Sequence, residues 1–75
     1  MTYLTRIEPE NNVNRWYFVA VQPTLFEPLA VICFWGRRGT KYQRVRILPA
    51  DTPAEAEELA ERIVSQKIKR GYGVK

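Results

Sequence analysis

The sequence predicts an α+β fold: a small twisted antiparallel sheet of about four strands with one C-terminal amphipathic helix packed on a face. Three observations lead to this fold class. Residues 1–50 alternate aromatic and β-branched segments with turns rich in Gly, Pro and Asn. Residues 51–73 carry apolar residues at helical spacing between a capping sequence and a glycine. Finally, 75 residues leave room for one small domain, which we expect to span residues 1–75.

Strands are expected at residues 2–8, 15–22, 29–36 and 41–48. The second and third are joined by a segment bracketed by prolines, which is too short for a crossover helix, so we expect them to pair antiparallel. The third strand is apolar enough to lie at the centre of the sheet. Gly39 can take the positive φ that the following hairpin needs. The first strand is expected to be a short edge strand.

The alternation of side chains along a strand assigns them to faces. Trp16 alternates with Phe18 and Ala20, and we interpret these residues as core, with Tyr17 on the opposite face. In the last strand the same rule separates apolar residues from arginines: Val45 and Ile47 lie on one face, and Arg44 and Arg46 lie on the other.

The helix is expected to begin at the sequence Thr52-Pro53-Ala54-Glu55. Thr52 is a capping residue, Pro53 suits the first helical position, and Glu55 completes a capping box. Gly71 is suited to end the helix in the left-handed conformation. Between these points the apolar residues recur at the spacing of one helical stripe: Ala56, Leu59, Ala60, Ile63, Val64 and Ile68.

The net charge of +4 is distributed in blocks. Residues 35–50 contain cations and no acid, residues 51–61 contain acids and no cation, and residues 62–75 are again basic. Cations without nearby counter-charges repel one another, which favours an anionic partner such as nucleic acid. The alternative is a solvated surface whose charge the acidic block balances within the fold. The cations of the first basic block are Arg37, Arg38, Lys41, Arg44 and Arg46.

The composition disfavours catalysis. The chain has no histidine and a single cysteine, Cys33, which removes histidine general bases, His/Cys zinc sites and an internal disulfide. Cys33 lies in the middle of a strand, where a buried and inert thiol is expected. The carboxylates at the start of the helix are explained by the helix dipole. We therefore expect no enzymatic activity, no metal and no cofactor.

No segment of the sequence points to a membrane or to secretion. The longest apolar run, residues 29–35, is too short to span a bilayer. Residues 1–10 lack the basic and apolar regions of a signal peptide. We expect a cytoplasmic protein that makes no membrane contact.

The sequence Trp35-Gly36-Arg37 places an indole and a guanidinium on the same face of a strand, since residues i and i+2 share a face. An indole can stack on a sugar or base, a guanidinium can grip a phosphate, and the glycine allows a ligand to approach closely. The alternative is internal packing, with the indole in a minor core beneath the turn and Arg37 stacked on it. The residues alone favour neither.

Three separated motifs occur in order: Asn14-Arg15-Trp16-Tyr17, the run from Trp35 to Lys41, and the closing run from Lys67 to Gly73. Together they resemble the WGR domain, a module of poly(ADP-ribose) polymerases and of short bacterial proteins. The resemblance implies binding to DNA breaks. It implies that Trp35 stacks on the sugar of a terminal nucleotide, that Arg37 contacts DNA and neighbouring domains, and that Asn14 lies at the 5′-terminal phosphate. No ADP-ribosylating domain accompanies the motifs, so polymer synthesis is not expected.

We therefore expect a non-catalytic nucleic-acid-binding module, with DNA favoured over RNA and DNA ends or breaks as a target. The alternative is a protein-interaction module that docks an acidic partner chain through the same basic hairpin. The sequence leaves the oligomeric state open, and we expect Tyr72 to pack back over the sheet. The expected binding residues are Asn14, Trp35, Gly36, Arg37, Arg38, Lys41, Arg44 and Arg46, with an extension over Lys67, Lys69, Arg70 and Tyr72.

Overall fold

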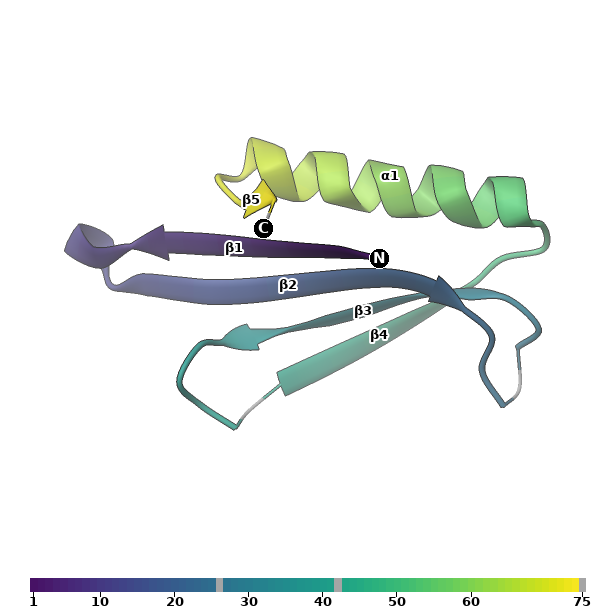
Figure 1. The fold of residues 1–75 in the computed structure, drawn as a ribbon, viewed down its shortest axis with the longest axis horizontal. Coiled ribbons are helices and arrows are strands. Elements are labelled where there is room, and N and C mark those ends of the chain that lie inside the picture. The colour runs from purple at the N-terminus through teal and green to yellow at the C-terminus, as the bar shows by residue number, and fades with distance from the viewer. Residues whose placement is uncertain (26, 42, 75) are drawn as a thin grey trace.

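The computed structural model describes residues 1–25, 27–41 and 43–74 and confirms the α+β fold class (Figure 1). Its sheet is open and antiparallel, with five strands in the order β4-β3-β2-β1-β5. The fifth strand was not predicted, because two residues after a glycine are too few to show a pattern. The elements are β1 (Thr2–Glu8), a 3-10 turn η1 (Pro9–Asn11), β2 (Val13–Gln22), β3 (Ala30–Arg37), β4 (Gln43–Pro49), α1 (Pro53–Lys69) and β5 (Gly73–Val74).

The turns follow the glycine, proline and asparagine signals with small shifts in their boundaries. Pro9 starts the 3-10 turn, and Asn12 then takes a left-handed conformation with φ 54°. Gly39 has the expected positive φ of 83° in the turn between β3 and β4. The strand expected from residue 41 starts later, because Lys41 still lies in this turn and β4 begins at Gln43. Tyr42, which was part of that expectation, lies outside the described residues.

Helix α1 has the predicted ends. The hydroxyl oxygen of Thr52 accepts a hydrogen bond from the backbone N–H of Glu55 at 3.1 Å, and Pro53 occupies the first helical position. Gly71 has φ 101°, and the N–H of Tyr72 donates to the carbonyl oxygen of Lys67 at 3.1 Å, which closes the last turn. The described part of the chain contains no helix that is long and apolar enough to cross a membrane.

The core lies between α1 and one face of the sheet (Figure 1), which we call the inner face. Antiparallel pairing places residues that lie directly opposite each other on the same face, so the register identifies the inner-face positions. Fully buried Leu4 comes from β1, fully buried Val31 and Cys33 come from β3, and Ala56 of α1 is 0% exposed against them. The other residues of the predicted helical stripe that contact this core are Leu59, Ala60, Ile63 and Val64.

The assignment of Trp16 and Phe18 to the core was wrong. Tyr17 is the buried residue, with 7% of its surface exposed, and it packs beneath α1. Trp16 and Phe18 are half-buried on the opposite face, which we call the outer face, and Ala20 is buried on that same face. Both faces of β2 are apolar, so alternation within one strand could not decide which of them the helix covers.

We expect removal of the Thr52 cap to destabilise the fold without changing it. Thr52→Ala leaves an N–H at the start of α1 without its acceptor, so the free energy of unfolding should fall by about 1 kcal/mol. In a chain of this size that loss lowers the Tm by about 4–8 °C in a thermal denaturation followed by circular dichroism. Thr52→Ser keeps the hydroxyl and is the matched control. Equal Tm values for Thr52→Ala and the unmodified chain would contradict the capping role.

Candidate nucleic-acid interface

A hollow of about 500 Å³ lies on the inner face, where the last turn of α1 passes over the strands. Cations and aromatic rings dominate its lining, and none of the described lining residues carries a carboxylate. We call it the basic hollow. It is lined by Arg6, Arg15, Tyr17, Trp35, Gly36, Arg37, Arg44, Lys67, Arg70 and Tyr72.

Three arginines form one row across the sheet at the side of the basic hollow. The register places Arg6 of β1 directly opposite Arg15 of β2, and Arg15 directly opposite Arg37 of β3. Like charges at such positions lie roughly 5 Å apart at their Cβ atoms and destabilise the sheet. The row therefore concentrates positive charge at a site where a bound anion would relieve the repulsion.

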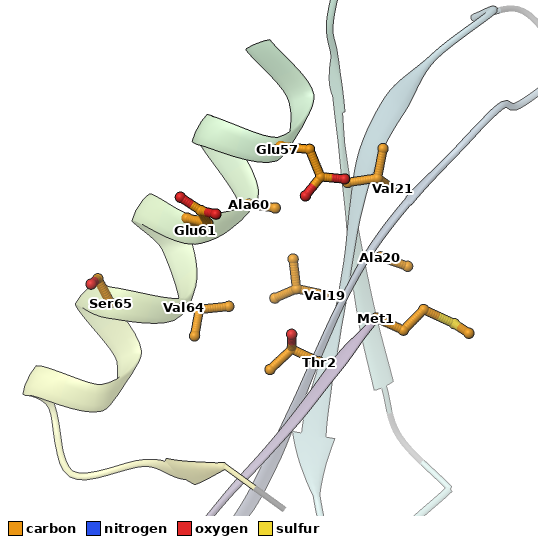
Figure 2. A pocket seen from close by; sticks show the side chains of 10 residues that line it. All are labelled: Met1, Thr2, Val19, Ala20, Val21, Glu57, Ala60, Glu61, Val64 and Ser65. Carbon is orange, nitrogen blue, oxygen red and sulfur yellow. The ribbon is translucent and has the colours of Figure 1, made fainter. Parts of the chain in front are cut away.

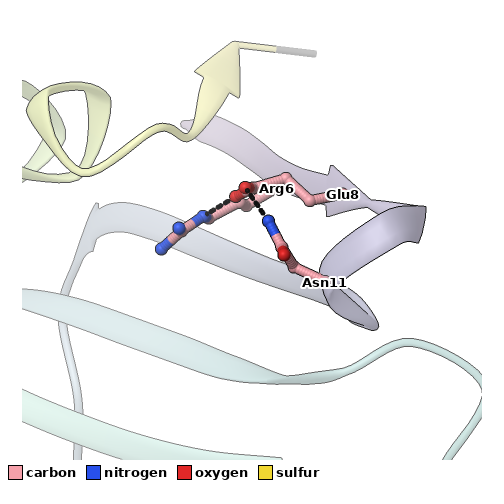
Figure 3. A network of polar contacts seen from close by, with 3 residues as sticks. All are labelled: Arg6, Glu8 and Asn11. Carbon is pink, nitrogen blue, oxygen red and sulfur yellow. Dashed lines mark hydrogen bonds and ion pairs between the residues drawn. The ribbon is translucent and has the colours of Figure 1, made fainter.

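Two members of this row have partners within the chain. The Nε of Arg6 donates to a carboxylate oxygen of Glu8, and the side chain of Asn11 donates to the same carboxylate at 3.3 Å (Figure 3). The hydrogen bond from Arg6 is the main cause that lowers the pKa of Glu8, so this carboxylate is ionised at neutral pH. Arg37 donates instead to the backbone oxygen and the side-chain Oδ1 of Asn12, at 3.2 and 3.0 Å.

Neutral hydrogen bonds leave the charge of Arg37 uncompensated. Among the described residues, neither Arg15 nor Arg37 has a carboxylate oxygen within ion-pair distance. The acidic block of residues 51–61 therefore does not neutralise this row by direct pairing. Its described ion pair joins Glu58 to Arg62 within α1, at 3.4 Å.

Aromatic rings form the floor of the basic hollow. The register places Tyr17 opposite Trp35, and their rings stack with centroids 5.6 Å apart and planes 18° apart. Tyr72 meets Tyr17 edge-on at 6.2 Å and so packs back over the sheet, as expected. Trp35 is half-buried, packs against the core and also lines the hollow. The packing alternative for this indole is therefore confirmed in that the ring packs against the core, and stacking on a sugar or base stays a prediction.

The C-terminal end of α1 lines the hollow with Lys67 and Arg70. The Nζ of Lys67 lies 4.5 Å from the centroid of the Tyr17 ring, and burial, followed by repulsion from Arg70, lowers the pKa of this lysine. Burial also raises the pKa of Tyr17, so the ring stays neutral. A Cβ at Gly71 would lie 3.3 Å from Nε of Arg6, which shows how closely the helix end approaches β1.

The structure brings together many, but not all, of the predicted binding residues. Arg38 and Lys41 are exposed in the turn between β3 and β4, and Lys69 is exposed on α1; none of them lines the hollow. Arg46 lines a smaller neighbouring hollow of about 210 Å³ that also contacts Cys33. The predicted residues that line the basic hollow are Trp35, Gly36, Arg37, Arg44, Lys67, Arg70 and Tyr72.

Asn14 lies apart from the basic hollow. Alternation along β2 places its side chain on the outer face with Trp16, opposite Ile7 of β1. Its side-chain Oδ1 is buried and has no hydrogen-bond partner in the structure. The backbone oxygen of Asn14 accepts from the N–H of Arg38 at 2.9 Å, which ties the turn after β3 to the start of β2.

Sequence reasoning missed Arg6, Arg15 and Tyr17 as lining residues of the hollow. Each lies outside the basic blocks, beside acids or within an aromatic strand. The alternation rule offered a signal, because Arg15 and Tyr17 share a face just as Trp35 and Arg37 do. Only the pairing of β2 with β3 shows that Arg15 and Tyr17 lie on the same face of the sheet as Trp35 and Arg37.

A second hollow, of about 520 Å³, lies between the other end of α1 and the sheet (Figure 2). Glu57 extends from the helix towards the strands, Glu61 also lines the hollow from the helix, and Val19 and Val21 line it from β2. None of its described lining residues is a lysine or an arginine. The two ends of the helix therefore face hollows that are lined by side chains of opposite charge.

Known proteins resemble this chain over most of its length. The model of the WGR domain family matches residues 1–75. An uncharacterized protein of Sinorhizobium fredii (strain NBRC 101917 / NGR234), y4dW, is 34% identical over 70 residues, which cover 93% of this chain. The chain spans about a third (34%) of that relative's length, and no solved structure matches it. WGR domains are non-catalytic and are commonly nucleic-acid-binding modules. The chain belongs to the WGR domain family.

Proposed function

We propose that this chain binds nucleic acid, with DNA as the preferred form, through the basic hollow. The cations neutralise backbone phosphates while Trp35 stacks on a sugar or base. The observation that supports this most directly is the row of Arg6, Arg15 and Arg37 beside the stacked pair of Tyr17 and Trp35. Guanidinium groups that can bind phosphates lie beside a flat aromatic surface. This combination suits a polymer in which phosphates alternate with sugars and bases.

The charge of the hollow favours a strand end over the middle of a duplex. Lys67 and Arg70 of α1 add two cations to the arginines that the sheet contributes. A terminal phosphate monoester also carries about −1.5 to −2 charges, more than a phosphodiester. Arg38 and Lys41 lie exposed in the adjacent turn, where they can neutralise the next phosphates along the strand.

Fluorescence anisotropy with a panel of labelled oligonucleotides tests this function. The panel contains blunt duplexes with and without a 5′-phosphate, a nicked duplex, single strands, a closed hairpin and the RNA equivalents. We expect the 5′-phosphorylated DNA ends and nicks to bind most tightly. Absence of binding to every probe at ~50 mM salt would contradict the proposal and favour an acidic protein partner.

Neutralising Arg44 should weaken binding and its dependence on salt. Arg44 lines the hollow next to Trp35, so Arg44→Gln should lower affinity and reduce the slope of log affinity against log salt by about 1. Arg62→Gln removes the same charge from the far side of α1, where Arg62 pairs with Glu58, and should leave the slope unchanged. Equal effects of the two variants would show that only net charge matters.

The two tryptophans provide a matched pair for the stacking role. Trp35→Leu should weaken binding by about 1–3 kcal/mol because the flat ring is lost from the hollow. Trp16→Leu removes the indole on the outer face and should leave the affinity for a short oligonucleotide unchanged. Circular dichroism and thermal denaturation establish whether each variant folds. A Trp35→Leu variant that folds and binds like the unmodified chain would rule out stacking.

Lys67 should give binding a distinctive pH dependence. Its pKa lies below the ordinary lysine value of 10.5, so its charge is lost at lower pH than that of exposed lysines, whereas arginines stay charged. Lys67→Met should weaken binding near pH 7, and the difference from the unmodified chain should shrink as the pH rises towards the ordinary lysine value of 10.5. Anisotropy titrations across this range provide the measurement. A difference that stays constant with pH would contradict a charged contact.

The same shift predicts the sign of the effect on stability. Because the folded chain has the lower pKa, folding disfavours the charged ammonium. The resulting loss of stability is complete below the folded pKa and disappears as the pH rises from that pKa to the ordinary value of 10.5. Lys67→Met should therefore not lower the Tm at pH 7. This outcome separates lost binding from lost stability.

A further inference from the structure

The outer face of the sheet is apolar and uncovered by α1. The register aligns Tyr3, Phe18, Phe34 and Val45 directly opposite one another, which forms one row across β1, β2, β3 and β4. Every side chain of these four strands that the register assigns to this face is uncharged. The arginines of β1 to β4, by contrast, all lie on the inner face.

The outer face is already ordered and partly exposed. Tyr3 and Trp16 stack with centroids 6.4 Å apart and planes 13° apart, and Phe18 meets Phe34 at 6.4 Å. Val45 and Ile47, on the adjoining strand β4, are 54% and 48% exposed. Rings that are already packed lose little side-chain entropy when a partner covers them, so such a face is suited to association.

We propose that the outer face is a dimerisation surface, on which two copies of this chain pack sheet against sheet. The two sheets would lie about 10 Å apart, with one helix on each outer side of the pair. In a dimer with a twofold axis, both copies use the same surface patch, so this patch must be complementary to itself. An apolar face meets this requirement without any pairing of charges.

The size of the face is sufficient for a weak dimer. Strands β1 to β4 contain 7, 10, 8 and 7 residues. At ~3.4 Å per residue and ~4.8 Å of width per strand, the face covers roughly 500 Å² per copy. Two copies then bury about 1,000 Å², which is near the lower limit for a specific interface. We therefore expect a weak dimer that forms only at high protein concentration.

Charge opposes a second copy less at the outer face than at the inner face. Two chains of net charge +4 repel when their basic surfaces meet, whereas the outer face brings no cation of one copy opposite a cation of the other. The arrangement also leaves both basic hollows pointing outwards on opposite sides. If the proposed function holds, one dimer therefore joins two nucleic-acid segments.

Sedimentation velocity of the full chain without nucleic acid tests the proposal independently of the proposed function. From about 1 μM to about 1 mM, we expect the weight-average mass to rise from 8.8 kDa towards twice that value. Ile47→Lys and Tyr3→Lys place a charge at opposite sides of the outer face, and each should weaken the dimer at least tenfold. Ile68→Lys is the matched control, because Ile68 on α1 is 47% exposed against 48% for Ile47.

The outcomes are distinct. A chain that remains at the monomer mass throughout the range would overturn the proposal, as would equal weakening by Ile47→Lys and Ile68→Lys. Pairing through the edge strand β4 would be disturbed by Ile47→Lys but not by Tyr3→Lys, and that result would also overturn it. Circular dichroism confirms folding, and Val45→Lys, at a residue that is 54% exposed, replaces either variant if it fails to fold.

Discussion

The pairing of β2 with β3 is the constraint on which both faces of this molecule depend. This register sets Tyr17 opposite Trp35 and Arg15 opposite Arg37, while the intervening residues turn to the outer face. A slip of one residue would exchange the faces, moving the arginines to the apolar side and the phenylalanines beneath the helix. The mutual repulsion of the arginine row is tolerated because Leu4, Val31 and Cys33 fix the same register through the buried core.

Much of the fold could be predicted because its signals are local. Thr52, Pro53 and Gly71 define the ends of α1 within a few residues of chain, and Gly39 defines the hairpin between β3 and β4. The separation of Arg44 from Val45 also follows from the geometry of a single strand. Each of these features requires no knowledge of what packs against it, and the structure confirms each of them.

The remaining features required tertiary information. Trp16 and Tyr17 are both large aromatic residues on a strand that is apolar on both sides, so only the position of α1 decides which of them is buried. Arg6 and Arg15 do not belong to any basic block of the sequence and enter the hollow only through the pairing of three strands. The basic blocks of the sequence therefore identify the lining residues that lie close together in the chain. They miss Arg6 and Arg15, which reach the hollow only through the strand register.

A small domain with a single helix cannot cover both faces of its sheet. The two faces therefore differ in which residues they leave uncovered. On the inner face, α1 covers the strands near Val19 and Val31, and the uncovered remainder holds the arginine row and Trp35. On the outer face, the described residues of β1 to β4 carry no charge that would favour exposure to water. The rings of Phe18 and Phe34 lie side by side on this face. Burying these rings against a second sheet would extend the core by the apolar area that the helix leaves uncovered. Because the two faces are back to back, association through the outer face leaves the basic hollow on the inner face uncovered.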